Sequence, residues 1–70
     1  MRELLMTIIN SDERITVRYK IAMDLYSVLR RLAILSDDMG EGKEIRYNNT
    51  ADDVRAWMDE HFDEYIKFVK

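Results

Sequence analysis

Residues 50–70 read TADDVRAWMDEHFDEYIKFVK. Their apolar side chains recur at intervals of three and four, which places them on one side of an α-helix. The apolar arc covers about half of the helical wheel, which is typical of a helix that packs on a globular core. Thr50 is expected to cap the start of this helix, because its hydroxyl can accept a hydrogen bond from the backbone N–H of Asp53. The apolar arc consists of Val54, Trp57, Met58, His61, Phe62, Tyr65, Ile66 and Val69.

The opposite face of this helix is acidic. Asp59 and Asp63 form one like-charge pair four residues apart, and Glu60 and Glu64 form another. Each such pair costs an isolated helix about 0.2–0.5 kcal/mol, and no feature of local structure accounts for them. Two explanations stay open: the four carboxylates keep a small protein soluble, or they meet a basic surface on a partner.

The composition is that of one small globular domain. The chain has 70 residues, a net charge of −3 and no cysteine, and 47% of its residues are hydrophobic. We expect a single compact domain over residues 1–70. Without disulfides or thiolate metal sites, stability depends on an efficient core or on self-association, so a homodimer is an open alternative. No signal-peptide pattern is present and no apolar run reaches about 18 residues, so we expect a cytoplasmic protein that does not contact a membrane.

The first third of the chain predicts a β-hairpin. Residues 3–9 form an apolar run, residues 10–13 a polar turn, and residues 15–21 alternate strictly between apolar and polar side chains. β-branched residues are abundant in the alternating segment, which favours a strand. The same residues also fit a long helix, because Ile15, Tyr19, Ala22, Met23 and Tyr26 follow helical spacing. The sequence leaves hairpin and helix open for residues 2–21, and we take the hairpin as the main prediction.

The middle of the chain predicts a helix followed by a short strand. Residues 22–39 have helical spacing, Gly40 follows as a C-terminal cap, and residues 43–47 alternate as a third strand before the last helix. The main prediction is therefore a small α+β domain, and the alternative is an all-α three-helix domain. Met23 and Ile34 fall on the polar side of the middle helix, where they are either singly exposed or part of an interface.

No catalytic, cofactor or metal site is expected. The segment around Gly40, Gly42 and Lys43 lacks the spacing of a phosphate-binding loop. His61, the one histidine, lies in the apolar arc of residues 50–70, where a half-buried, hydrogen-bonded side chain is expected rather than a metal ligand. The sequence offers no nucleophile with a neighbouring base, so we do not expect an enzyme.

Charge is segregated along the chain, and this pattern leads to three functional hypotheses. The main one is a small acidic regulator or inhibitor that occludes a basic surface on a partner protein, including one that imitates a nucleic acid. Its contact residues would be Asp59, Glu60, Asp63 and Glu64, supplemented by Met23 and Ile34. The alternatives are a structural homo-oligomer and a nucleic-acid-binding module. The nucleic-acid contact would use the basic residues of the middle segment, Arg14, Arg18, Lys20, Arg30 and Arg31.

Overall fold

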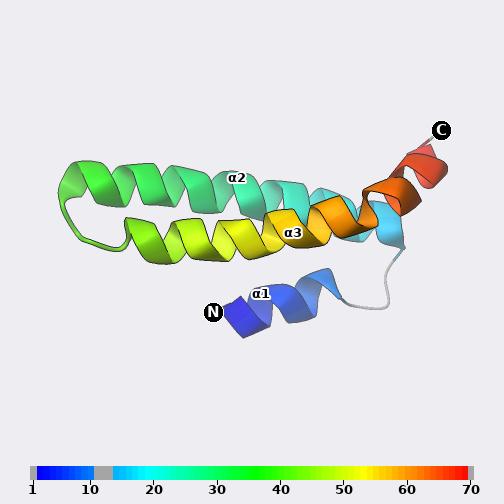
Figure 1. Ribbon diagram of the computed structural model, residues 1–70, viewed down its shortest axis with the longest axis horizontal. Helices are drawn as coiled ribbons and strands as arrows, with labels where there is room; N and C mark the ends of the chain where they lie inside the picture. Colours follow the sequence, from blue (N-terminus) through cyan, green and yellow to red (C-terminus); the bar gives the residue numbers. More distant parts are fainter. Residues whose placement is uncertain (1, 11–13, 70) are drawn as a thin grey trace.

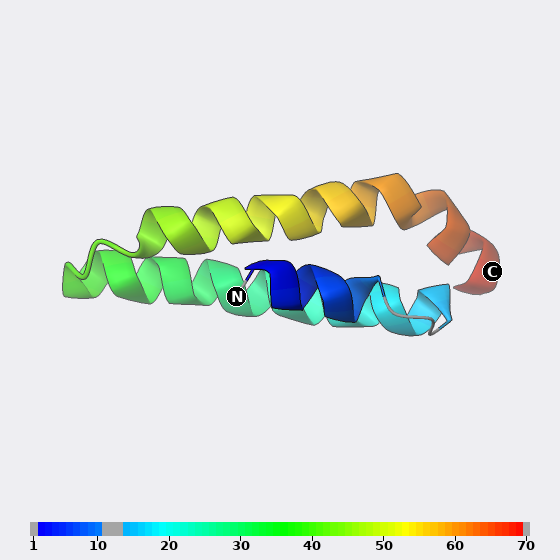
Figure 2. The same cartoon turned by 90° about the horizontal axis from the view of Figure 1, so that it is seen from below.

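Two long antiparallel helices form the body of the molecule (Figure 1). The computed structural model describes residues 2–10 and 14–69, which form α1 (Arg2–Ile9), α2 (Ile15–Met39) and α3 (Glu44–Val69). α2 and α3 lie side by side, and α1 lies against the half of this hairpin that contains the start of α2 (Figures 1 and 2). The molecule is elongated, with extents of 42 × 22 × 15 Å.

The α+β prediction is wrong, and the three-helix alternative is confirmed. Within residues 2–10 and 14–69 there is no strand, because residues 15–21 belong to α2 and residues 44–47 form the first turn of α3. A helix satisfies its backbone hydrogen bonds internally, whereas a strand here would need a neighbouring strand that the described residues do not supply. Of the turn predicted at residues 10–13, residues 11–13 lie outside the described residues, as does Lys70 at the end of the last helix.

α2 meets α3 through buried side chains that are four, three, seven, four and three residues apart along α2. This spacing keeps one stripe of α2 on the side of its partner helix. Alanines are placed at several of the contact positions, and their small side chains allow close packing of the two backbones. The buried residues are Ile15, Tyr19, Ala22, Leu29, Ala33 and Ser36 on α2 and Thr50, Ala51, Val54 and Trp57 on α3.

The connection between the two helices confirms Gly40 as a C-terminal cap. Gly40 has a φ of 70°, in the left-handed region that glycine adopts without a side-chain clash. Its N–H donates to the carbonyl of Asp37 at 3.1 Å, and the N–H of Glu41 donates to the carbonyl of Ser36 at 3.0 Å. This pair of bonds is the Schellman arrangement, which satisfies two carbonyls at the end of α2.

The start of α3 differs from the prediction for Thr50. The helix begins at Glu44, so Thr50 lies inside it and does not cap it. Its side chain is buried against α2, and its hydroxyl donates to the carbonyl of Arg46 at 3.0 Å. Asn48 and Asn49, predicted to turn the chain, are helical. The short alternation of residues 43–47 therefore reflects the two sides of the first turn of a helix.

α1 is joined to the hairpin at its C-terminal end. Ile9 is fully buried in the core, and Met6 packs against the same cluster. Directly after α1, the side-chain carbonyl of Asn10 accepts a hydrogen bond of 2.8 Å from the indole N–H of Trp57. The described end of α1 is thus tied to the middle of α3 by both apolar packing and a polar bond.

Candidate functional site

The four acids predicted to contact a partner all lie at exposed positions near the C-terminal end of α3. Asp59, Glu60, Asp63 and Glu64 are each exposed to solvent. Since residues four apart are neighbours on a helix, these four carboxylates form two parallel rows, 59 with 63 and 60 with 64. We call this set the acidic face.

Only one member of the acidic face has a counter-ion among the described residues. The Arg55 Nε donates to the Asp59 carboxylate at 3.2 Å, one helical turn away. Glu60, Asp63 and Glu64 form no ion pair or side-chain hydrogen bond within residues 2–10 and 14–69. Three neighbouring negative charges therefore remain available to an external cation or basic side chain.

An aromatic cluster supports the acidic face from the inner side of α3. The rings of Tyr19 and Tyr65 are stacked with centroids 4.2 Å apart. Trp57 and Phe62 lie 6.3 Å and 6.4 Å from the same Tyr19 ring in tilted arrangements. Burial, and secondarily the charge of Asp59, raises the pKa of the Tyr19 phenol above its usual value. These contacts fix the segment of α3 that carries the acids.

His61 is half-buried within this cluster, as its place in the apolar arc predicts. Its ring stacks on Trp57 with centroids 4.2 Å apart, and its Nδ1–H donates to the Trp57 carbonyl at 2.9 Å. Both contacts are with the preceding turn of the same helix. Among the described residues, no group of three or more histidine, cysteine, aspartate or glutamate side chains is arranged to hold a metal ion.

The two apolar residues predicted to supplement the acidic face lie in different places. Met23 is 45% exposed and lies one turn from Tyr19, next to the aromatic cluster. Ile34 is 63% exposed but lies about 16 Å further along α2, at the rise of 1.5 Å per residue. Phe62, which the sequence places in the core, is 47% exposed and directly follows His61 on α3. Phe62, next to Asp63 in the sequence, therefore adjoins the acidic face, whereas Met23 lies beside the aromatic cluster and Ile34 lies apart from both.

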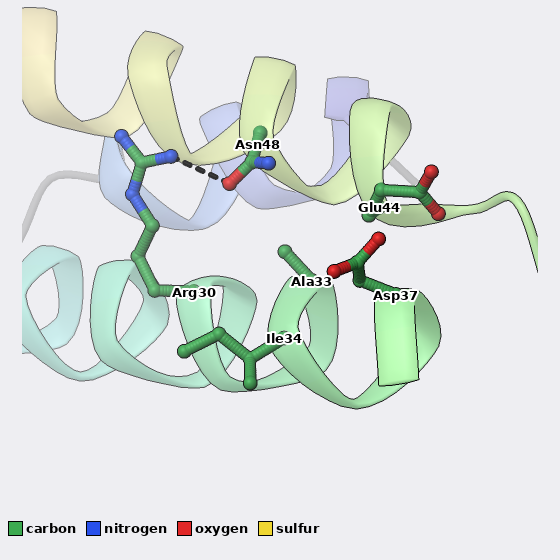
Figure 3. Close-up of a pocket in the computed structure, with 6 residues that line it drawn as sticks. All are labelled: Arg30, Ala33, Ile34, Asp37, Glu44 and Asn48. Atoms are coloured by element: carbon green, nitrogen blue, oxygen red, sulfur yellow. Dashed lines mark hydrogen bonds between the residues drawn. The ribbon is translucent and has the colours of Figure 1, made fainter. Parts of the chain in front are cut away.

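Ile34 instead lines a cleft between α2 and α3 near their connection (Figure 3). Arg30 spans this cleft: its guanidinium donates to the side-chain oxygens of Asn48 and Asp52, each at 2.6 Å. The carboxylates of Asp37 and Glu44 both lie at its other end. The cleft has a volume of about 350 Å³ and is lined by Arg30, Ala33, Ile34, Asp37, Glu44 and Asn48.

Arg30 also lies over the ring of Tyr26, with the guanidinium carbon 5.0 Å from the ring centroid. A hydrogen bond from Arg30, and to a lesser extent its positive charge, lowers the pKa of the Tyr26 phenol, while burial acts in the opposite direction. The sequence does not reveal this network. Asp52 looks like a residue that complements the helix dipole, and its pairing with Arg30 depends on the register of two helices.

The basic residues predicted to contact a nucleic acid do not share one face. In a strand, Arg18 and Lys20 would project together, whereas in α2 they point about 200° apart around the axis. Lys20 and Arg31 lie on the outer side of the helix, and Arg30 is directed to α3. The basic residues that this alternative requires are thus divided between the outer side of α2 and the side that faces α3. The predicted residues were Arg14, Arg18, Lys20, Arg30 and Arg31.

No helix within residues 2–10 or 14–69 combines the length and hydropathy required to cross a membrane. Comparisons of the chain with protein-family models, with curated proteins and with solved structures found no significant match. The functional assignment therefore depends on the geometry and charge of the molecule itself.

Proposed function

We propose that the protein binds a basic surface of another protein through the acidic face and acts by occluding that surface. The observation that carries this proposal is the group of three exposed carboxylates, Glu60, Asp63 and Glu64, which have no counter-ion among the described residues. Their mutual repulsion disfavours the helix locally, and binding of a cationic surface relieves it.

The spacing of the acidic face resembles the charge density of a nucleic acid. Residues 60 to 64 cover about 6 Å of helix axis and carry three carboxylates that are unpaired within the described residues, or about one charge per 2 Å. Duplex DNA carries one charge per about 1.7 Å of its axis. A groove that binds phosphates through lysine and arginine would therefore meet a similar density of negative charge on α3, which supports imitation of a nucleic acid.

Apolar contacts at the edge of the acidic face add short-range affinity. Phe62, next to Asp63 in the sequence, exposes 47% of its surface, and Met23, one turn from Tyr19 in the aromatic cluster, exposes 45%. Aromatic side chains that become buried at an interface often contribute much of its binding energy, while rim charges mainly accelerate association. The acids would thus steer the partner, and Phe62 would anchor it.

The test is a capture experiment that compares three baits of known charge. The wild-type protein is compared with the triple variant Glu60→Lys, Asp63→Lys and Glu64→Lys. Asp59 is left unchanged, because its pairing with Arg55 belongs to the folded helix. The control variant reverses three exposed acids elsewhere, Glu3, Asp24 and Glu41, and therefore has the same net charge as the triple variant. Circular dichroism establishes that all three baits are helical.

Each bait is incubated with lysate of the source organism, with and without nuclease treatment, and washed at low and at moderate salt. The proposal predicts a protein that wild-type and control baits retain at low salt, that the triple variant fails to retain, and that moderate salt releases. Equal loss from the control and triple variants would show that only net charge matters and would contradict the proposal. Recovery of nucleic acid alone from untreated lysate would favour the basic residues of α2 instead.

A further inference from the structure

α2 carries a second apolar stripe that does not face α3. Its members are spaced four, three, four, three and four residues apart, which is the heptad spacing of a helix that packs against another helix. At 100° of rotation per residue, this stripe lies about 110° around the axis of α2 from the buried stripe that contacts α3. We call it the second seam. It consists of Ile21, Leu25, Val28, Leu32, Leu35 and Met39.

One half of the second seam is left uncovered. Leu25 packs against the core cluster, in the half of the hairpin where α1 lies. α1 does not extend along the half of α2 that leads to the connection with α3 (Figures 1 and 2). Val28, Leu32, Leu35 and Met39 are 50%, 36%, 55% and 69% exposed. Four large apolar side chains in heptad register therefore line one side of a solvent-exposed helix.

The charges beside the open half of the seam indicate what covers it. Arg31 and Asp38 are one heptad apart on the same edge, and both are exposed. Neither forms an ion pair within the described residues. In an antiparallel pair of identical helices, residues on this edge face each other across the seam. If Leu32 packs opposite Leu35 of a second copy, Arg31 lies opposite Asp38 of that copy, and the reverse pair forms by symmetry.

The alternative registers are less favourable. Moving the two helices by one heptad, so that all six seam residues overlap, places Arg31 opposite Arg31 and Asp24 opposite Asp38 of the second copy. Like charges that face one another across an interface oppose association. In a parallel arrangement, the edge with Arg31 and Asp38 would face the other edge of the second copy's seam. That edge contains Leu29 and Ser36, which carry no charge to pair with Arg31 or Asp38. The charge pattern is therefore self-complementary in one antiparallel register.

We propose that residues 28–39 of α2 form an antiparallel, two-fold symmetric contact with the same residues of a second copy of this chain. Val28 packs against Met39 and Leu32 against Leu35 across the axis, and each contact is made twice. The seam is about 17 Å long, at 1.5 Å per residue, which places the contact in the class of small, reversible interfaces. We therefore expect a weak dimer that dissociates on dilution.

This dimer is compatible with the proposed function but does not depend on it. The open half of the seam, residues 28–39, lies at the end of the hairpin where α2 connects to α3, whereas the acidic face lies near the C-terminal end of α3, at the opposite end of the molecule (Figure 1). Both acidic faces of a dimer stay exposed. The inference also moves self-association away from Met23 and Ile34, because these two residues lie on the other side of α2, toward Arg30 and the cleft.

Sedimentation equilibrium of the full chain from about 5 to about 500 µM tests the proposal, because a dimer of this kind forms by mass action. The wild type should pass from monomer to dimer within this range. Leu32→Glu, at an exposed position, should raise the dissociation constant about tenfold or more. The matched control Ile34→Glu adds the same charge to an exposed position outside the seam and should leave the dissociation constant unchanged.

A charge-exchange series tests the register. Arg31→Asp and Asp38→Arg should each weaken the dimer, because each change makes like charges face one another. The double variant Arg31→Asp with Asp38→Arg should restore wild-type association, because the pairs form again with exchanged signs. A protein that stays monomeric at every concentration, or a dimer that Ile34→Glu weakens and Leu32→Glu does not, overturns the proposal. A double variant as weak as the single variants overturns the antiparallel register.

Discussion

Replacing Ile15 with alanine tests the helical packing of the segment that the sequence predicts as a strand. Ile15 is 3% exposed and lies in the core between α2 and α3. The change removes three carbons at about 0.8 kcal/mol each and leaves part of a cavity, so we expect a loss of about 3 kcal/mol. Domains have about 0.05–0.15 kcal/mol of stability per residue, so this loss is about 30% or more of the total for a chain of this size.

Val17→Ala is the matched change. Val17 is 45% exposed on the outer side of α2. Removing two carbons that are about half buried should therefore lower the free energy of unfolding by about 0.8 kcal/mol. The higher helix propensity of alanine returns about 0.5 kcal/mol, which leaves a net effect of less than about 0.5 kcal/mol. Urea denaturation followed by circular dichroism measures both variants. In a strand, positions 15 and 17 share one face, so equal losses at the two positions would refute the helical packing.

Three further predictions concern single contacts. Gly40→Ala should lower the free energy of unfolding by about 1 kcal/mol, because residue 40 has a φ of 70°, which a residue with a Cβ rarely adopts. An unchanged melting temperature would contradict the left-handed cap. Asn10→Ala should lower the free energy of unfolding by about 1 kcal/mol or more, because it leaves the indole N–H of Trp57 without its acceptor. The backbone amides of α1 should then exchange with solvent faster than in the wild type. Unaltered exchange in α1 would argue against this link. Tyr26 should ionise below and Tyr19 above pH 10.0, as seen in the tyrosinate absorbance of the two phenylalanine variants. Tyr26 thus adds to the stability of the fold only at alkaline pH, and this contribution is lost as the pH falls through its lowered folded-state pKa. The contribution of Tyr19 is present below pH 10.0 and is lost as the pH rises through its raised folded-state pKa. If the two tyrosines titrate in the reverse order, both assignments are contradicted.

The segment of residues 15–21 shows why the fold could be predicted only in part. Its alternating pattern fits a strand, but Ile15, Tyr19 and Ala22 also fit a helix, and all three are buried in the interface with α3. The choice depends on partners far along the chain: Tyr19 stacks on Tyr65 and contacts Trp57. These tertiary contacts outweigh the β propensity of the local sequence.

Where local rules decide the structure, the predictions agree with it. The helical period of residues 50–70 and the cap at Gly40 follow from helix geometry and backbone sterics, and Val54, Trp57 and Gly40 lie as predicted. Phe62 and Val69 belong to the same apolar arc but are about half exposed. The start of the last helix does not agree with the prediction. Thr50 has the chemistry of a cap, but it lies inside α3, where packing on α2 sets its position. The exposure of the acidic face could be predicted from its wheel position. The second seam could not, because the apolar residues of α2 look like one broad face until α3 and α1 cover part of it.

The most direct test of the proposed function is the association rate of the captured partner with four neutral variants. These are Asp59→Asn, Glu60→Gln, Asp63→Asn and Glu64→Gln, measured by surface plasmon resonance at low salt. Because Arg55 already neutralises Asp59, the variant at residue 59 should slow association least, and each of the other three should slow it several-fold. Wild-type association rates in all four variants, or the largest effect at Asp59, would contradict binding through the unpaired carboxylates of α3.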